Sequence, residues 1–458
     1  MNKSGRWLTS FTMLKSFGPS CLNRSDDGEP KQQMMGGTLR ARGSSAWLKR
    51  AWRKAMKDGK SFDVHTAHIQ DCVEEILKEM AKTGKIKENE IDYYGAMICN
   101  QGAKSNVILD ANWKKRSSLA AENDKDADVS ADASAENTKG KKKKKDEDGD
   151  NGDNKSDKDK KFTITVASPE EILAVINAVI DYDKAEKEAG KKASPSELFT
   201  AAENALACIP MSLDKAMFGN MATDGAIGTV DGSVYVADAY SIDEYKPEYD
   251  YHTATFYPAV VPDGSAFFEG FNLFNKSREE TKGAETIANS WLNSNTMLIQ
   301  TAVNLSEFKK NLAKAVSDED KITDMLAENV AEYAKVVATV IPESSQHSHY
   351  SKPLPDILYF EITNGEGFTV DGSFAPKIVK PTSDKGVSEI GIERILGFTR
   401  SVTDLDNYLD NSCVRKRYVF LSQNMSGYTE EFEKAGVTVL HNLSEVSGIL
   451  VNEVKAVA

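Results

Sequence analysis

The spacing of apolar residues predicts helices in two parts of the chain. In residues 63–84, apolar side chains recur every three or four positions, as on one face of a helix. Residues 169–190 open with a proline and two glutamates and end at a glycine, and residues 194–207 offer a serine as N-cap. Two more helices are expected further along, at residues 305–316 and 320–341.

Alternating apolar and polar positions predict strands in the second half. The alternation is found at residues 230–241, the segments 295–305, 356–363 and 415–422 also resemble strands, and residues 438–454 indicate a strand followed by a helix. A stretch rich in aromatic residues, Pro and Gly separates the first two strands, which suggests a hairpin or loop that leaves the core and returns. Because helices and strands mix without a regular βαβ rhythm, the class expected is α+β.

One segment is not expected to fold. Residues 120–161 contain no aromatic residue and almost no apolar one, so ordering them would bury too little surface to offset the entropy lost. We interpret them as a disordered insertion. The lysine run at 141–145 could contact nucleic acid, but its acidic neighbours favour a solvated loop that neutralises itself.

Composition narrows the class of protein. No run of 18 apolar residues occurs in the 458, and the N-terminus lacks a continuous apolar segment, so we expect a cytoplasmic protein without a membrane partner. The five cysteines are widely spaced, which favours reduced thiols. The six histidines are scattered, so neither a metal site nor another cofactor is expected.

A basic helix stands out in a chain of net charge −13. From Ser45 onward, apolar residues including Trp47 and Trp52 form one stripe, and Lys49, Arg50, Arg53, Lys54 and Lys57 fall on other faces. Eight basic residues and one acid lie between Thr38 and Lys60. A polyanion, most commonly nucleic acid, would suit this face, whereas the alternative is a solvated surface or pairing with acidic segments of the chain.

Small residues adjoin the basic helix. Gly36-Gly37 permits positive φ and close backbone approach. It precedes Arg40, Arg42 and a helix N-terminus, so we expect both arginines and the helix amides to close on an RNA phosphate. The stretch lacks the GK[ST] ending of a nucleotide-hydrolysing loop. A second Gly-rich stretch at 217–233 carries Met221, whose flexible side chain could wedge against a base, although a plain turn is the simpler interpretation.

Together these stretches resemble one family. PSCLNRSDDGEPKQQMMGGTLRARGSSAWLKRAWRK and MFGNMATDG followed by VDGSVYVADAYSIDEYKPEYDYHTA are similar, in the same order, to motifs of the CasC-type backbone subunit of type I-E CRISPR surveillance complexes, known as Cascade. A weaker match is IPESSQHSHYSKPLPDIL. The resemblance covers about residues 20 to 360, and the part after about 400 has no counterpart in it.

The resemblance implies an RRM-like (ferredoxin-like) palm, a helical fingers insertion and a protruding thumb hairpin. The palm would use residues 1–60, 205–243 and, with a C-terminal extension, 297–458; the fingers would be 61–204 and the thumb 244–296. It further implies a non-enzymatic role, in which copies of the subunit stack along CRISPR RNA. They would do so with other Cascade subunits and present the guide for pairing with target DNA.

The family pattern also assigns residues. It places Arg24, Lys31, Ser44, Lys49, Arg50 and Arg53 near guide phosphates, Met221 against a base and Thr253 near the base of the thumb. This chain departs from the pattern beside the helix, where Gly43 and Ala46 flank the serines and the family's glutamine is missing.

Two alternatives stay open. Related backbone subunits of type III complexes cut RNA with an acidic residue in a palm loop, and Asp26 and Asp27 lie in such a loop here. A carboxylate near RNA could help activate a 2′-hydroxyl or hold a metal. The other alternative is an RNA-binding module that works alone.

Overall fold

The chain packs as two units in a computed structural model. Unit 1 comprises Met1–Lys60 and Ser233–Ala458, and unit 2 comprises Ser61–Gly232. The structure describes residues 5–26, 28–56, 64–66, 69–99, 108–109, 113, 165–221, 225–254, 286–342, 348–365, 367–408 and 415–458. The predicted insertion at 120–161 therefore lies outside the described residues, as do Asp27 and residues 255–285 of the predicted thumb.

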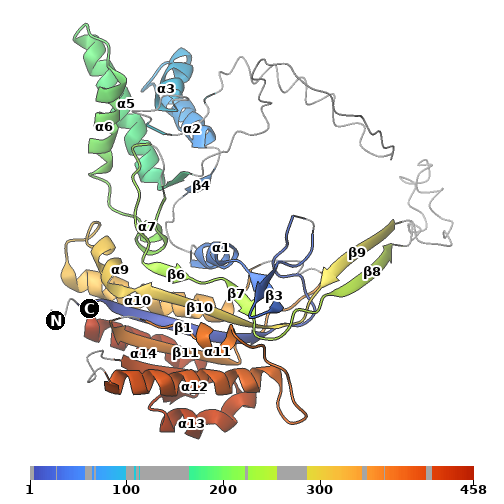
Figure 1. The fold of residues 1–458 in the computed structure, drawn as a ribbon. Helices are drawn as coiled ribbons and strands as arrows, with labels where there is room; N and C mark the ends of the chain where they lie inside the picture. The colour runs from blue at the N-terminus through green and yellow to red at the C-terminus, as the bar shows by residue number, and fades with distance from the viewer. Residues whose placement is uncertain are drawn as a thin grey trace, which may run out of the picture. The chain divides into compact units, whose positions relative to one another are not determined.

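A nine-stranded sheet organises the described part of unit 1 (Figure 1). Its order is β13-β12-β11-β1-β10-β7-β3-β2, with β6 also paired to β10. The strands are β1 (Trp7–Ser16), β2 (Gln32–Met35), β3 (Thr38–Gly43), β6 (Val234–Val236), β7 (Ala239–Ser241), β10 (Thr296–Asn304), β11 (Ile357–Asn364), β12 (Arg415–Leu421) and β13 (Thr438–Leu440). Only the β12–β13 pair is parallel among these described strands.

Strand β1 lies in the middle of the sheet and buries both of its faces. Phe11 contacts Tyr333 of helix α10 edge to face, with ring centroids 6.3 Å apart. Leu14, on the opposite face, belongs to a core with Ile392 and Phe432. One face is thus covered by α1 (Ser45–Met56), α9 (Leu305–Leu312), α10 (Glu319–Thr339) and α14 (Leu443–Val457), and the other by α11 (Asp371–Phe374), α12 (Val387–Tyr408) and α13 (Thr429–Lys434).

Unit 2 is mostly helical in its described residues. Its helices are α2 (Ile69–Lys82), η1 (Glu88–Glu90), α3 (Ile91–Ile98), α5 (Pro169–Glu188), α6 (Pro195–Leu206) and α7 (Leu213–Phe218). The unit also contains a two-stranded ribbon of β4 (Val64–Thr66) and β5 (Thr165–Ala167). Ser168 and Ser194 cap α5 and α6, each in a reciprocal capping box with a glutamate three residues on. Helices were therefore correctly predicted there.

Several sequence-based boundaries need correction. The helix expected over 63–84 begins only at Ile69, because residues 64–66 pair with β5 instead. The strand expected over 230–241 is divided into β6 and β7. Residues 205–232 group with unit 2 and residues 233–243 with unit 1, and the assignment of 205–243 to a palm stays a prediction. The α+β class is confirmed.

The predicted excursion at 244–296 has paired strands at both ends. β8 (Glu248–Ala254) and β9 (Thr286–Leu292) form a two-stranded antiparallel ribbon (Figure 1). Tyr249 contacts Trp291 across it, with ring centroids 4.9 Å apart. No described helix of the chain is long and apolar enough to cross a membrane.

Candidate nucleic-acid interface

Helix α1 is held to unit 1 by its apolar stripe. Leu48, Trp52 and Met56 are buried. Trp52 packs edge to face on Tyr333, with centroids 6.0 Å apart, and its indole N–H donates to the Val340 carbonyl at 3.3 Å. The expectation that the tryptophans anchor the helix is therefore confirmed for Trp52, while Trp47 is half-buried at the edge of a hollow.

The outward side of α1 carries two pairs of cations, and the two members of each pair are about one helical turn apart. Lys49 and Arg53 form one pair and are half-buried, and Arg50 and Lys54 form the other and are exposed. Among the residues that the structure describes, no carboxylate forms an ion pair with Lys49, Arg50 or Lys54. Burial, and secondarily the charge of Arg53, lowers the pKa of Lys49. Like charges held this close favour an anionic partner.

The N-terminus of α1 is already satisfied by the chain itself. Ser44 is the cap, because its hydroxyl accepts the Trp47 amide at 3.3 Å. The Ser45 amide donates to Asp238 at 2.7 Å, and the Ser44 amide donates to the Asn23 side chain at 3.0 Å. The prediction that these amides attract phosphate therefore needs correction, since a carboxylate of the chain occupies that place.

Asp238 joins the helix to a neighbouring arginine. Its carboxylate accepts from Arg42 Nε at 2.8 Å and from the Ser45 amide. Burial by itself would raise the pKa of Asp238, but these hydrogen bonds outweigh it and hold the pKa below its ordinary value. Arg42 is half-exposed and sits beside α1 with part of its charge compensated.

Arg40 has a structural role. Its side chain is 0% exposed, and its guanidinium donates to the carbonyls of Ser241, Ile242 and Phe374 at 2.9 to 3.3 Å. The sequence placed Arg40 with Arg42 as a phosphate ligand, and this needs correction, because a guanidinium enclosed by three carbonyls cannot reach a ligand at the surface.

Gly36 and Gly37 form the turn of the β2–β3 hairpin. Their φ values are +59° and +74°, as the sequence led us to expect. A Cβ on Gly36 would lie 2.0 Å from the Ala375 carbonyl oxygen, so the close approach is made by the chain's own backbone. Gly43 has a similar role, because a Cβ there would lie 2.9 Å from the Trp47 ring. The departure from the family pattern at Gly43 thus makes room for Trp47.

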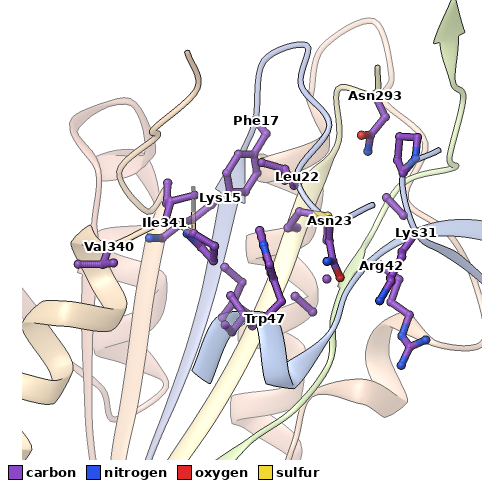
Figure 2. Close-up of a pocket in the computed structure, with 18 of the residues that line it drawn as sticks. Lys15, Phe17, Leu22, Asn23, Lys31, Arg42, Trp47, Asn293, Val340 and Ile341 are labelled. Carbon is purple, nitrogen blue, oxygen red and sulfur yellow. The ribbon is translucent and has the colours of Figure 1, made fainter. Parts of the chain in front are cut away.

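Arg24 and Lys31 lie in the segment between β1 and β2, in which Arg24 is bridged to Pro30. Arg24 is exposed, Lys31 is half-buried, and the Lys31 carbonyl accepts the Arg42 amide at 2.8 Å. Lys31 and Arg42 line one side of a hollow under α1, and Lys15 lies on the other side, next to Val340 and Ile341 (Figure 2). The free volume of this α1 hollow, about 20 Å³, suits one or two water molecules.

The two other candidate residues belong to other elements. Met221 belongs to unit 2 and is 83% exposed, just after a bridge between Asn220 and Val230. Thr253 is in β8, opposite Ile287 of β9. Unit 1 thus brings together Arg24, Lys31, Arg42, Ser44, Lys49, Arg50 and Arg53.

Sequence reasoning missed three residues of this region. Asn23 and Asp238 fix the start of α1, and Lys15 is enclosed beneath it. Asp238 lies 193 positions from Ser45, so no local signal links them. Asp26, one of the two candidate catalytic acids, is exposed. The described residues contain no cluster of three His, Cys, Asp or Glu side chains able to hold a metal.

Comparisons with solved structures identify the fold. Two matching chains come from structures described as "CRISPR RNA-guided surveillance complex, pre-nicking" and "CRISPR RNA-guided surveillance complex". The first is 16% identical with a TM-score of 0.65 and covers 98% of this chain and 100% of that one. The second is 12% identical with a TM-score of 0.50 and covers 97% and 99%.

The sequence itself matches a family model. No curated protein matches it. The model described as "CT1975-like protein" matches residues 10–256 and 267–446, which include α1, the Met221 loop and the C-terminal strands. The chain therefore belongs to the CT1975-like protein family.

Proposed function

We propose that this protein is a guide-RNA-binding backbone subunit of a type I-E Cascade complex. It oligomerises along CRISPR RNA, with α1 of each copy facing the phosphates, and presents the guide for pairing with target DNA. Other Cascade subunits complete the ribonucleoprotein, which acts in the cytoplasm in antiviral defence. The subunit itself binds and does not catalyse.

The observation that carries this proposal is the cation arrangement on α1. Four cations occupy two rows on a helix anchored by Trp52, and Lys49, Arg50 and Lys54 have no carboxylate partner among the described residues. RNA offers phosphates in a regular line, which matches a rigid row of cations better than a single small anion does. Arg24, Lys31 and Arg42 extend the charged surface beside the helix, and Ser44 fixes where the helix starts.

The sequence motifs and the fold support the finer assignment. The likeness to chains from CRISPR RNA-guided surveillance complexes covers nearly the whole protein. In the proposal, the sheet of unit 1 is the RRM-like palm, unit 2 includes the fingers, and the β8–β9 ribbon is the base of the thumb, with Thr253 near the guide. Exposed Met221 packs against a guide base.

The decisive experiment is to purify the protein with the products of its neighbouring genes and sequence the RNA that accompanies it. Repeat-derived guides of uniform length, in particles much larger than 50.3 kDa, are expected. A monomer carrying random RNA would refute the filament role and favour a module that works alone.

The endonuclease alternative has its own test. Assembled complex is incubated with guide-complementary RNA and Mg²⁺. The proposal expects intact RNA, whereas regularly spaced cuts that an Asp26→Ala variant abolishes would overturn it.

A further inference from the structure

Lys15 is an enclosed cation beneath the proposed RNA-binding face. It lies on β1 with a side chain that is 1% exposed. Its ammonium donates to the carbonyls of Val337 and Ala338, in the last turn of α10, at 3.2 and 2.7 Å. No carboxylate among the described residues forms an ion pair with it, so its charge is balanced only by the carbonyl dipoles at a helix C-terminus.

The described lining of the hollow between Lys15 and α1 carries no negative charge. Helix α1 supplies Trp47, Leu48 and Trp52 to the α1 hollow, and β10 supplies Met297 and Ile299, none of which can neutralise a cation. The charged groups that line the hollow besides Lys15 are Lys31 and Arg42, and Asn23 and Asn293 are neutral. Within the described lining, therefore, every charge is positive. Low-polarity walls screen such charges less than water does.

We propose that Lys15 increases the affinity for RNA through its positive charge, without touching the RNA. As a result, the protein takes up a proton when it binds RNA. This rests on the proposed function of the α1 face. Phosphates on α1 attract a proton to the ammonium below them, so Lys15 is charged more often in the complex than in the free protein.

The protonation state of Lys15 is balanced near neutrality. Burial lowers the pKa of its ammonium from the ordinary 10.5 to about 7. The lysine is therefore charged at pH 6 and mostly neutral at pH 8.5 in the free protein. Because bound phosphates raise the pKa, affinity for RNA should fall as pH rises through this range.

The test compares wild type, Lys15→Met and the control Lys434→Met, which removes a lysine from α13 on the opposite face of the sheet. Binding of a guide-length RNA is measured at pH 6.0 and 8.5 and constant ionic strength. Wild type and Lys434→Met should lose about fivefold more affinity over this range than Lys15→Met does. Equal pH dependence in all three would overturn the inference while leaving RNA binding intact. Failure of wild type to bind at all would instead refute the proposed function.

Calorimetry keeps the inference testable if Lys15→Met does not fold. Wild type is titrated with RNA at pH 7.5 in two buffers of different ionisation enthalpy, which counts the protons taken up. A fraction of one proton is expected, and it should persist in Lys49→Met, the other lysine of this face with a lowered pKa. Zero uptake, or uptake that disappears with Lys49, would overturn the assignment to Lys15.

Discussion

Two basic runs in this chain resemble one another in sequence and differ completely in structure. Residues 49–54 read KRAWRK, and residues 415–417 read RKR. In β12, the side chains of Arg415 and Arg417 are buried with Glu361 and Asp406, at 2.7 Å from Arg415 to Glu361 and 2.5 Å from Arg417 to Asp406. Helix α1 has no such carboxylates for Lys49 and Arg50 in the described structure. A dense basic run therefore indicates a ligand only where the fold brings no acid to it.

Breaking the buried cluster should have the largest effect on stability. Arg415→Met leaves two enclosed carboxylates, Glu361 and Asp406, with only Arg417 to compensate them, which should lower the free energy of unfolding by about 3–5 kcal/mol. Chemical denaturation measures this. The matched control is Lys416→Met, whose ammonium pairs with Glu453 at the surface and should change stability by less than about 1 kcal/mol. A stability loss no larger than that of the control would show that the cluster does not hold the fold.

Reversing charge on α1 should instead affect binding. Lys49→Glu with Arg53→Glu should weaken RNA binding about a hundredfold and reduce the salt dependence of log K by about 0.7 for each phosphate that is no longer neutralised. Binding is measured over a series of salt concentrations. Lys434→Glu is the control for a charge reversal away from α1, at half the change in net charge. An unchanged salt slope in the double variant would mean that α1 does not face phosphate.

Asp238 is an acid that joins the basic face, and its removal sharpens the contrast. Asp238→Asn weakens the bonds to Ser45 and Arg42 and should cost about 1 kcal/mol at pH 7. Because the folded pKa of Asp238 lies below its unfolded value, the stabilisation is present above about pH 4 and lost as pH falls through the folded pKa. Thermal unfolding from pH 3 to 7 measures it. A difference that persists undiminished at the lowest pH would rule out the carboxylate as its source.

The lysine run at 141–145 should contribute neither to RNA affinity nor to assembly. Its acidic neighbours lie in the same segment, so it needs neither the fold nor RNA for compensation. Deleting residues 120–161 should leave RNA affinity and assembly within about twofold of the full chain. Loss of assembly on a native gel would show that this segment has a role of its own.

Much of the fold could be predicted where the signal is local. Ser168 and Ser194 each precede a proline and a glutamate at capping distance, and α5 and α6 begin there. Strand β1 and helix α12 were not among the segments that spacing singled out. In WLTSFTMLKS, polar Thr9, Thr12 and Lys15 are buried beside apolar residues, so the strand has no simple alternation.

The candidate site was predictable only in part, for a related reason. The apolar stripe of α1 is a local pattern, and it identified the outward cations correctly. Arg40 is held inside the fold by carbonyls about 200 and 334 positions away, which accept its hydrogen bonds. The Ser45 amide of α1 is occupied by the distant Asp238 carboxylate. Nothing in RAR distinguishes the buried arginine from the half-exposed one. Tertiary partners decide this, and sequence spacing does not contain them.

The central position of β1 has a consequence for how the chain reaches its native state. Its hydrogen-bonding partners begin 280 or more residues later, with Ser16 opposite Thr296 and Trp7 opposite Asn364. At ribosomal rates, β1 waits on the order of tens of seconds for β10 and β11. Unit 2, in contrast, is contiguous and is synthesised before either partner. The first strand made is therefore among the last to pair, and its exposed apolar residues make chaperone protection during translation advantageous.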